Sequence, residues 1–493
     1  MFLTGIVFGS TSQEEEETGV LVLKAPVVRD FKTGARHIFS VSVREKEAVE
    51  ITCERRGVDI GLAVFAPTGE KISVSNAPAG FAGFDRIFFI AETAGEYRLE
   101  LDSRRPGSLT GSYTILLKDQ RAATEADFVR AAAMKLLGEA RAELTGAENR
   151  FEKSARAAES LEKALALFEQ AEDLQGQAIA LFHIALIKGY EFGDKTKSIE
   201  LYEKALDIWG KIDDEAGRAI CLTYLADEIR DYDNAEHARD FYTEKARKYF
   251  DEALSLYRKL NDKPDEAAAL SFLCRLFNDT GNFQKGFETC RESQRLGGDR
   301  DPLTDYRTYG TLASLYSNSG DLENALEHNQ IALERLAIAK DYVNPYRSAF
   351  IKGNMGLALA NQKKYAEAEQ NLREALAITE REKRTLYSGY TLVRLASILY
   401  DTKRFPESLD CGKKAVEYYR AVDPIKIQGA LNVLGNTYFA LGQVSQARAL
   451  FTEAVEINRR TKDRYAEAES LYNLARLENH DGNPEAARQN IEL

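Results

Sequence analysis

Apolar and polar positions alternate with a period of two over residues 20–118. The runs HIFSVSV (37–43) and AVEITC (48–53) each place every second side chain on one face, as expected of half-buried strands. Turn-forming clusters that contain glycine or proline separate such runs at residues 66–70, 91–96 and 104–108. About seven short strands without a helical pattern between them predict an all-β antiparallel sandwich over residues 20–118.

From residue 119 onwards the apolar period becomes helical and remains so to the C-terminus. In the segment 431–458, Leu434 and Gly435 of one helix are followed by Ala447 and Phe451 of the next. The small residue after the leucine-type position recurs at Ala185, Ala226, Cys274, Ala313, Gly356, Ala396, Gly435 and Ala475, with separations of 41, 48, 39, 43, 40, 39 and 40 residues. A second small residue follows twelve positions later at Gly286, Ala325, Ala368, Ser408, Ala447 and Ala487. Because small residues let two helix backbones approach, the pattern predicts stacked helix pairs.

This frame resembles the tetratricopeptide repeat (TPR), and the resemblance implies an all-α solenoid, a right-handed superhelix of helix pairs. The period is near 40 residues instead of 34, and six extra residues lengthen each pair by about 9 Å of helix. In this respect the chain resembles the kinesin-light-chain style of repeat. We expect about nine pairs, including a less regular leading pair at residues 126–172 and lengthened helices at residues 230–245.

The sequence therefore predicts a multidomain chain. Its parts are interpreted as a signal remnant and acidic linker (1–19), a β-sandwich (20–118), a junction with the leading helix pair (119–177) and the TPR solenoid (178–493). The motifs APTG (66–69) and AGEY (94–97), with their spacing, resemble the bacterial pre-peptidase C-terminal (PPC-like) sandwich. That resemblance implies an accessory module rather than a catalytic one.

Composition narrows the classes of function. The 493 residues carry a net charge of −12, with a pI near 5.3, which argues against a nucleic-acid-binding surface. No run of about 18 apolar residues occurs, so the sequence predicts no membrane span. The five cysteines include no CxxC pair. Cys274 and Cys290 could meet across two packed helices, but we expect them to be separate small core residues.

Signatures of catalysis are absent from the sequence, which has no HExxH, GxxxxGK[ST], GxSxG or GxGxxG motif. The SxxK match Ser160–Lys163 lies within a repeat helix, and Cys411 occupies a second-helix position of a repeat. Packing or solvent exposure explains both. The sequence therefore predicts a chain that is not an enzyme and that has neither a cofactor nor a metal site.

Polar residues on the first helix of each pair are the candidate binding residues, because the first helices of a TPR superhelix line its concave face. The positions three before, one after and four after the small residue share one helix face. An asparagine there offers a donor and an acceptor for the backbone of an extended peptide. The predicted peptide-binding residues are Arg275, Asn278, Asn354, Tyr400, Asn432, Asn436, Asn473 and Arg476. The alternative is that these side chains are solvated or link adjacent repeats.

The leading functional hypothesis is a non-catalytic scaffold that binds a protein or peptide on the concave TPR face. The order of sandwich, RAATEAD junction (121–127) and long repeats resembles the non-catalytic N-terminal part of bacterial TPR–CHAT proteins. This resemblance implies the regulatory part of a caspase-like protease system whose protease domain is absent from this chain. The alternative is a carbohydrate or cell-surface binding protein that uses the sandwich, although the single tryptophan, Trp209, lies in the helical region.

The sequence also supports one prediction about each end of the chain. The segment MFLTGIVFG (1–9), followed by an acidic stretch, resembles the end of an export signal, which favours an extracytoplasmic location over a cytoplasmic one. The last helix stops at Leu493, so Leu471, Leu474, Ile491 and Leu493 itself are expected to be partly bare. We expect a downstream domain, a separate subunit or a second copy of the chain to cover them.

Overall fold

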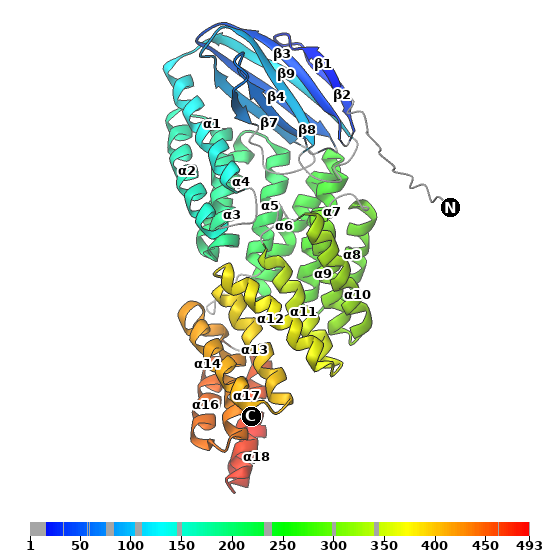
Figure 1. Cartoon of the computed structure of the whole chain (residues 1–493), viewed down its shortest axis with the longest axis vertical. Coiled ribbons are helices and arrows are strands. Elements are labelled where there is room, and N and C mark those ends of the chain that lie inside the picture. Colours follow the sequence, from blue (N-terminus) through cyan, green and yellow to red (C-terminus); the bar gives the residue numbers. More distant parts are fainter. Residues whose placement is uncertain are drawn as a thin grey trace, which may run out of the picture.

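The structure is a computed structural model that describes residues 16–492 except 33, 57, 59, 75–82, 104–110, 145–149, 231–238, 298–301, 340–344 and 462. Within these residues, nine β-strands are followed along the chain by 18 α-helices. The strands form a sandwich at one end of an elongated molecule, and the helices extend away from it in stacked pairs (Figure 1). The predicted order of an antiparallel sandwich and a helical solenoid is confirmed.

Two sheets make up the sandwich, with the strand orders β1-β3-β8-β5-β6 and β2-β9-β4-β7. The strands are β1 (Glu16–Val20), β2 (Val27–Phe31), β3 (Arg36–Val43), β4 (Glu47–Arg56), β5 (Ile60–Phe65), β6 (Lys71–Val74), β7 (Gly83–Ile90), β8 (Gly95–Ser103) and β9 (Gly111–Ala122). The described strand pairings are antiparallel except that of β1 with β3, which is parallel. The alternating pattern does not reveal the edge strands β1, β2 and β6, because strands of four or five residues carry too few alternating positions.

The helices of the described residues form nine consecutive pairs, as expected. The first helices are α1 (Glu125–Glu143), α3 (Leu174–Leu186), α5 (Glu215–Arg230), α7 (Lys263–Asp279), α9 (Pro302–Asn318), α11 (Tyr346–Asn361), α13 (Thr385–Asp401), α15 (Gln428–Ala440) and α17 (Arg464–His480). The second helices are α2 (Arg150–Gln170), α4 (Lys195–Lys211), α6 (Arg239–Leu260), α8 (Phe283–Gly297), α10 (Leu322–Ile338), α12 (Tyr365–Arg381), α14 (Phe405–Val422), α16 (Val444–Thr461) and α18 (Pro484–Glu492). A short π-helix, η1 (Ile187–Glu191), follows α3. The longest helix, α6, has 22 residues and begins in the segment where lengthening was predicted.

The small residues of the repeat frame lie at the contact between the helices of a pair, and all eight are buried. A Cβ atom added at Gly435 would lie 2.5 Å from the Phe451 ring, and one added at Gly356 would lie 2.7 Å from Leu372. Such short contacts would force neighbouring side chains to move in a close-packed interior. The frame therefore marks the places where the helices of a pair approach most closely.

The sandwich rests on the first helices of the solenoid. Phe88 of β7 packs in the same core as residues of α1. Arg86 of β7 donates from Nη1 to Asp173 Oδ1 at 3.0 Å, and Asp173 caps α3 by accepting from the Gly176 amide at 3.1 Å. Asp173 therefore ties the sandwich to the beginning of α3.

The curvature of the solenoid brings distant turns together. Arg384, just before α13, donates to the carbonyl oxygens of Tyr190 at 3.2 Å and Glu191 at 2.6 Å, and it also pairs with the Glu191 carboxylate. Lys383 adds an ion pair with Glu152 of α2 at 3.4 Å. The turn between α12 and α13 thus contacts α2 and η1, and Arg384 lies 193 residues after Glu191 in the sequence.

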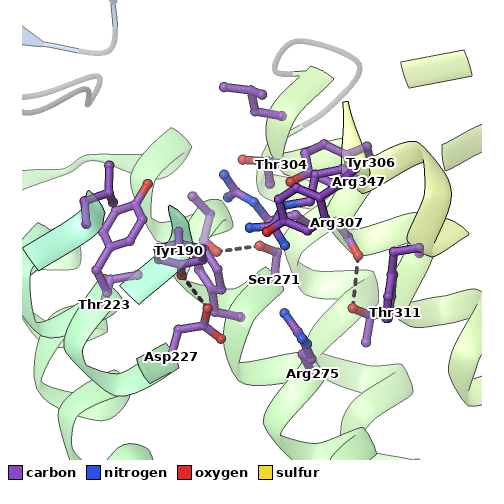
Figure 2. Close-up of a pocket in the computed structure, with 18 of the residues that line it drawn as sticks. Tyr190, Thr223, Asp227, Ser271, Arg275, Thr304, Tyr306, Arg307, Thr311 and Arg347 are labelled. Atoms are coloured by element: carbon purple, nitrogen blue, oxygen red, sulfur yellow. Dashed lines mark hydrogen bonds between the residues drawn. The ribbon is translucent and has the colours of Figure 1, made fainter. Parts of the chain in front are cut away.

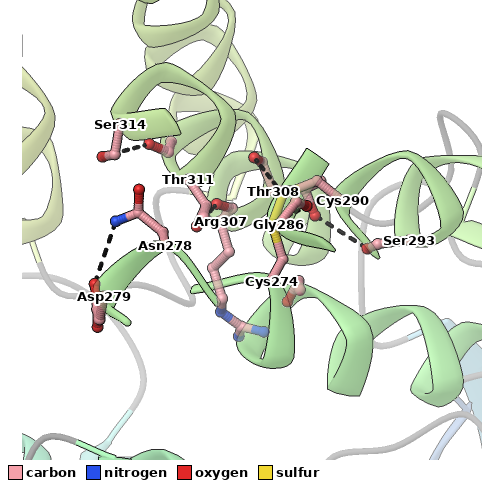
Figure 3. The surroundings of a disulfide bond; sticks show 12 residues. Cys274, Asn278, Asp279, Gly286, Cys290, Ser293, Arg307, Thr308, Thr311 and Ser314 are labelled. Carbon is pink, nitrogen blue, oxygen red and sulfur yellow. Dashed lines mark hydrogen bonds between the residues drawn. A yellow bond between two sulfur atoms is a disulfide. The ribbon is translucent and has the colours of Figure 1, made fainter. Parts of the chain in front are cut away.

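A disulfide bond joins Cys274 of α7 to Cys290 of α8, with Cα atoms 5.4 Å apart (Figure 3). The expectation that they are separate small core residues is wrong. Both side chains are buried between the two helices of one pair, where the close approach of the backbones brings the sulfur atoms together. Cys53, Cys221 and Cys411 are not part of a disulfide bond.

At the C-terminal end, Ile491 is 68% exposed, as expected for bare apolar surface. Leu471 is only 5% exposed, contrary to the expectation, and Leu474 is partly buried in a core with Phe451. Leu493 and the residues before 16 lie outside the described residues. No described helix has both the length and the apolar character that crossing a membrane requires.

Candidate binding groove

The first helices of the pairs surround a cavity of about 930 Å³. Helices α5, α7, α9 and α11 supply most of its wall, and residues of α1, α3, α6, α10, α13, η1 and the strands β5, β6 and β8 add to it. Figure 2 shows polar and aromatic side chains of α5, α7, α9, α11 and η1 around this space. The inner face of the solenoid is therefore hollowed next to the sandwich.

One part of the wall holds a carboxylate. Asp227 of α5 accepts from the Tyr190 hydroxyl at 2.5 Å and from Arg230 Nε at 2.9 Å. Burial opposes ionisation of Asp227, but the positive charges of Arg230 and Arg275 outweigh it and lower the pKa of Asp227 to about 2. Arg230 also pairs with Asp279 of α7. Asp227 is therefore an ionised group of the groove at neutral pH.

Another part of the wall carries arginines that lie over aromatic rings. The Arg347 guanidinium carbon lies 5.4 Å from the centroid of the Tyr190 ring and 4.9 Å from that of Tyr346. The Arg307 guanidinium carbon lies 4.6 Å from the centroid of the Phe272 ring. Cation–π contacts of this kind position a guanidinium group and leave N–H edges for acceptors on a ligand.

The arginines and the phenol groups beside them shift one another's pKa values. Burial alone would raise the pKa of Tyr306, but the nearby charges of Arg347 and Arg307 outweigh burial and lower it below its ordinary value. Burial would likewise lower the pKa of Arg347, but the adjacent Tyr346 and Tyr306 hydroxyls raise it above its ordinary value. Both shifts arise because guanidinium and phenol groups crowd together here.

Amide side chains extend the polar lining from one helix pair to the next. Asn318 of α9 donates from Nδ2 to Asn278 Oδ1 of α7 at 3.0 Å. Arg394 of α13 donates from Nη1 to Asn354 Oδ1 of α11 at 3.2 Å. In both bonds the partners are 40 residues apart, so the bonds join neighbouring first helices.

Three of the eight predicted binding residues line this cavity, namely Arg275, Asn278 and Asn354. The other five lie further along the solenoid, on α13, α15 and α17, and are not part of the cavity wall. The structure thus places three of the predicted residues, from the middle of the solenoid, in one cavity wall.

Asn432 of α15 is 2% exposed, and its Oδ1 accepts from Ser470 Oγ of α17 at 3.1 Å. Ser470 in turn accepts from Asn458 Nδ2 of α16 at 3.1 Å. These bonds connect successive helices of two repeats. They correspond to the alternative role in the sequence analysis, a link between adjacent repeats.

Asn436 and Asn473 both lie next to Arg476. The Arg476 Nη1 atom is 3.3 Å from Asn436 Oδ1 and 3.5 Å from Asn473 Oδ1. The centroid of the Tyr400 ring lies 5.7 Å from that of Phe405. The contacts of these residues lie within the solenoid, and their role in peptide binding stays a prediction.

Several polar residues of the cavity are not among the predicted binding residues, although the sequence carries a signal for some of them. Asp227 directly follows the small residue Ala226, so the repeat frame covers it. Arg307 and Arg347 each follow a tyrosine and are 40 residues apart, which is the repeat period. Tyr190 lies in the π-helix after α3, and the repeat frame predicts no binding residue at this position.

Models of the tetratricopeptide repeat match residues 306–328, 347–421 and 427–492. Tetratricopeptide repeats are therefore present in this part of the solenoid. No curated protein sequence matches the chain.

No group of three or more His, Cys, Asp or Glu side chains that could hold a metal ion occurs in the part of the chain that the structure describes.

Several solved structures are similar to this chain. Aspartyl phosphate phosphatase F from Bacillus subtilis is 14% identical with a TM-score of 0.45, and the match covers 75% of this chain and 93% of the phosphatase chain. A Signal Transduction ATPase with Numerous Domains from Pyrococcus horikoshii, with a tetratricopeptide repeat sensor, is 14% identical with a TM-score of 0.44. This match covers 68% of this chain and 51% of the ATPase chain. BtubC from P. vanneervenii is 22% identical with a TM-score of 0.39, and the match covers 46% of this chain and 93% of the BtubC chain. Similarity at this level identifies neither a partner nor an activity.

Proposed function

We propose that this repeat-containing chain is a non-catalytic scaffold that binds a segment of a protein partner in its inner cavity. The observation that carries the proposal is the cavity itself, about 930 Å³ in volume and lined mainly by the first helices of four consecutive pairs. Cavities of this size, with a few well-placed polar groups, are typical of ligand sites. Repeat solenoids commonly use their concave surface for binding.

Arg275, Asn278 and Asn354 are the predicted binding residues that this proposal retains. Their side chains come from α7 and α11 and lie in the cavity wall. An asparagine can accept from a backbone N–H and donate to a backbone C=O of an extended segment. Lys71 and Asp102 of the sandwich also line the cavity, which supports an accessory role for the sandwich as an end wall.

From the sequence resemblance alone, we also propose that the sandwich is PPC-like and that the chain is the regulatory part of a bacterial caspase-like (CHAT) protease system. We place the chain outside the cytoplasm. The disulfide between Cys274 and Cys290 supports this location, because disulfides persist mainly in oxidising compartments.

A glycine in the cavity wall allows a direct test of the groove. A Cβ atom added at Gly310 of α9 meets nothing within 4 Å. Gly310→Trp should therefore fill the cavity without disturbing the packing of the helices. Gly210 of α4 is the matched control, because it is an exposed helical glycine with an equally open Cβ position.

The probe is a phage-displayed library of random dodecapeptides selected on the unmodified chain. We expect the selected peptides to bind the unmodified chain and Gly210→Trp with the same Kd. They should bind Gly310→Trp at least about tenfold more weakly, because the indole occupies their site. Equal binding to all three proteins would contradict the proposed function.

A further inference from the structure

We propose that the cavity admits the free end of a protein chain and excludes a segment from the middle of a chain. This inference rests on the proposed function and names the class of partner that the cavity accepts. Its structural basis is a ring of contacts that the wall forms around the cavity, together with the position of the sandwich.

Contacts between neighbouring elements run around the cavity in a closed circuit. Each step of the circuit joins two elements through a hydrogen bond, an ion pair or a shared hydrophobic core. The joining pairs are Tyr190 with Asp227 (η1 to α5), Arg230 with Asp279 (α5 to α7), Asn278 with Asn318 (α7 to α9) and Tyr306 with Ile351 (α9 to α11). The circuit closes because Arg347 of α11 lies over the Tyr190 ring of η1, with 5.4 Å between the guanidinium carbon and the ring centroid. These elements therefore form a closed ring around the cavity.

Arg384, in the turn between α12 and α13, fastens the ring at the place where it closes. Its guanidinium group donates to the carbonyl oxygens of Tyr190 and Glu191 and pairs with the Glu191 carboxylate. The guanidinium carbon also lies 4.6 Å from the centroid of the Tyr346 ring of α11. Arg384 thus holds η1 and α11 together, and we refer to these contacts of Arg384 as the clasp.

Burial keeps the clasp closed. The side chains of Arg384 and Glu191 are 8% and 9% exposed, and Tyr346 is 3% exposed. Separating a buried ion pair is unfavourable, because each charge then stays without a partner in a place that water hardly reaches. Molecules with an open clasp are therefore a minor population at equilibrium.

The sandwich covers one end of the ring. Leu62 of β5, Lys71 of β6 and Asp102 of β8 belong to the cavity wall. Figure 1 shows the sandwich at the ends of α5 and α7. A chain that enters the ring from the other side meets these strands and stops there. The cavity is therefore a blind pocket with one entrance.

A blind pocket inside a closed ring restricts how a polypeptide can enter. A segment with chain on both sides has to pass sideways between η1 and α11, where the clasp holds the wall together. Its other route is to enter as a folded loop, whose two strands lie about 4.8 Å apart and need roughly twice the width of one chain. A free end enters as a single extended chain, and its backbone can then bond to Asn278 and Asn354 of the wall.

The probes are random dodecapeptides in three formats, attached to a small folded carrier domain. The peptide stands at the N-terminus of the carrier, at its C-terminus, or between two copies of it. In the internal format, flexible glycine–serine linkers of about 20 residues on each side keep the carriers away from the rim of the cavity. Peptides are selected on the unmodified chain from each format, and every selected peptide is measured in all three formats by biolayer interferometry. We expect a format with a free end to bind at least about tenfold more tightly than the internal format.

Arg384→Ala removes the clasp and should admit the internal format. The difference between the formats should fall below about threefold, because the ring can then open sideways. A merely structural role of Arg384 would instead weaken all formats alike. Lys383→Ala is the matched control, since it removes only the exposed ion pair with Glu152 from the same turn, and it should retain the preference for a free end. If Arg384→Ala does not fold, Arg384→Lys and Glu191→Gln weaken the clasp by smaller changes and should narrow the difference in the same direction.

The possible results distinguish this inference from the proposed function. If all formats bind the unmodified chain equally and Gly310→Trp abolishes their binding, the cavity takes a protein segment, but the inference about chain ends is wrong. If a free end is preferred and the preference survives the substitutions at Arg384 and Glu191, the clasp does not exclude internal segments, and the inference is overturned. If no format binds, both proposals fail.

Discussion

The contact between Arg384 and the end of α3 can be tested by removing its charged side chain. Arg384→Ala deletes the ion pair with Glu191 and the hydrogen bonds to two carbonyl oxygens of η1. The side chains of Arg384 and Glu191 are 8% and 9% exposed, so little water can replace the lost partner. Breaking a buried pair by removing one member costs about 3–5 kcal/mol, because the remaining charge stays buried.

Hydrogen exchange of the amides in residues 187–194 is the appropriate measurement, because the loss is local. A decrease of about 3 kcal/mol in the free energy of local opening corresponds to roughly 100-fold faster exchange. The amide of Asp194 bonds to Lys188 O at 2.8 Å and that of Gly193 bonds to Gly189 O at 3.0 Å, so both report on this turn. Amides of the sandwich should exchange at the same rate in both proteins.

Glu152→Gln is the matched control for the same contact. It breaks the ion pair of Lys383 with Glu152, whose side chains are 65% and 59% exposed. An exposed pair of this kind contributes about 0–1 kcal/mol, so exchange in η1 should hardly change. If Arg384→Ala also changed exchange less than about threefold, the contact would not stabilise the turn, and the reasoning from burial would be refuted.

Three further predictions concern other parts of the chain. Asn432→Ala should lower the free energy of unfolding, measured with urea, by about 1 kcal/mol, because it removes a buried hydrogen bond with Ser470 Oγ, which keeps Ala466 O as a second acceptor. Asp227→Asn should cost about 2 kcal/mol near neutral pH. Since the pKa of Asp227 is lowered to about 2 in the folded chain, this difference should be present above pH 4 and disappear as the pH falls towards 2, which urea titrations at several pH values can check. Replacing both Cys274 and Cys290 with alanine should lower stability by about 3 kcal/mol, because the bond closes a loop of 16 residues, and the same loss should follow when a reductant is added to the unmodified chain.

The sequence predicts the architecture well because the signals for it are local. Gly435 is small since Phe451, sixteen positions later, occupies the space that a Cβ atom would need. Gly356 stands in the same relation to Leu372, and such a relation can be recognised without knowing how the pairs curve. Alternation in β4 is a similar signal, because Val49, Ile51 and Cys53 are all fully buried.

The content of the groove is harder to predict, because it depends on how curvature accumulates over several repeats. Arg275 and Asn432 both stand on the same predicted helix face, yet one lines the cavity and the other is buried against Ser470. The repeat frame does not distinguish these outcomes. The contact of Arg384 with Glu191 joins positions 193 residues apart, and no local pattern reports it.

The position of Asp173 has a mechanical consequence. Its carboxylate joins the sandwich to the first turn of α3, and the far end of α3 continues into η1, which carries Tyr190 into the cavity wall. With 13 residues, α3 is a rod about 20 Å long, since each residue adds about 1.5 Å. A force that tilts the sandwich would therefore move α3 as a rigid rod, and α3 would displace the Tyr190 ring beneath Arg347. We expect strain applied to the outer strands to change the shape of the cavity at a distance.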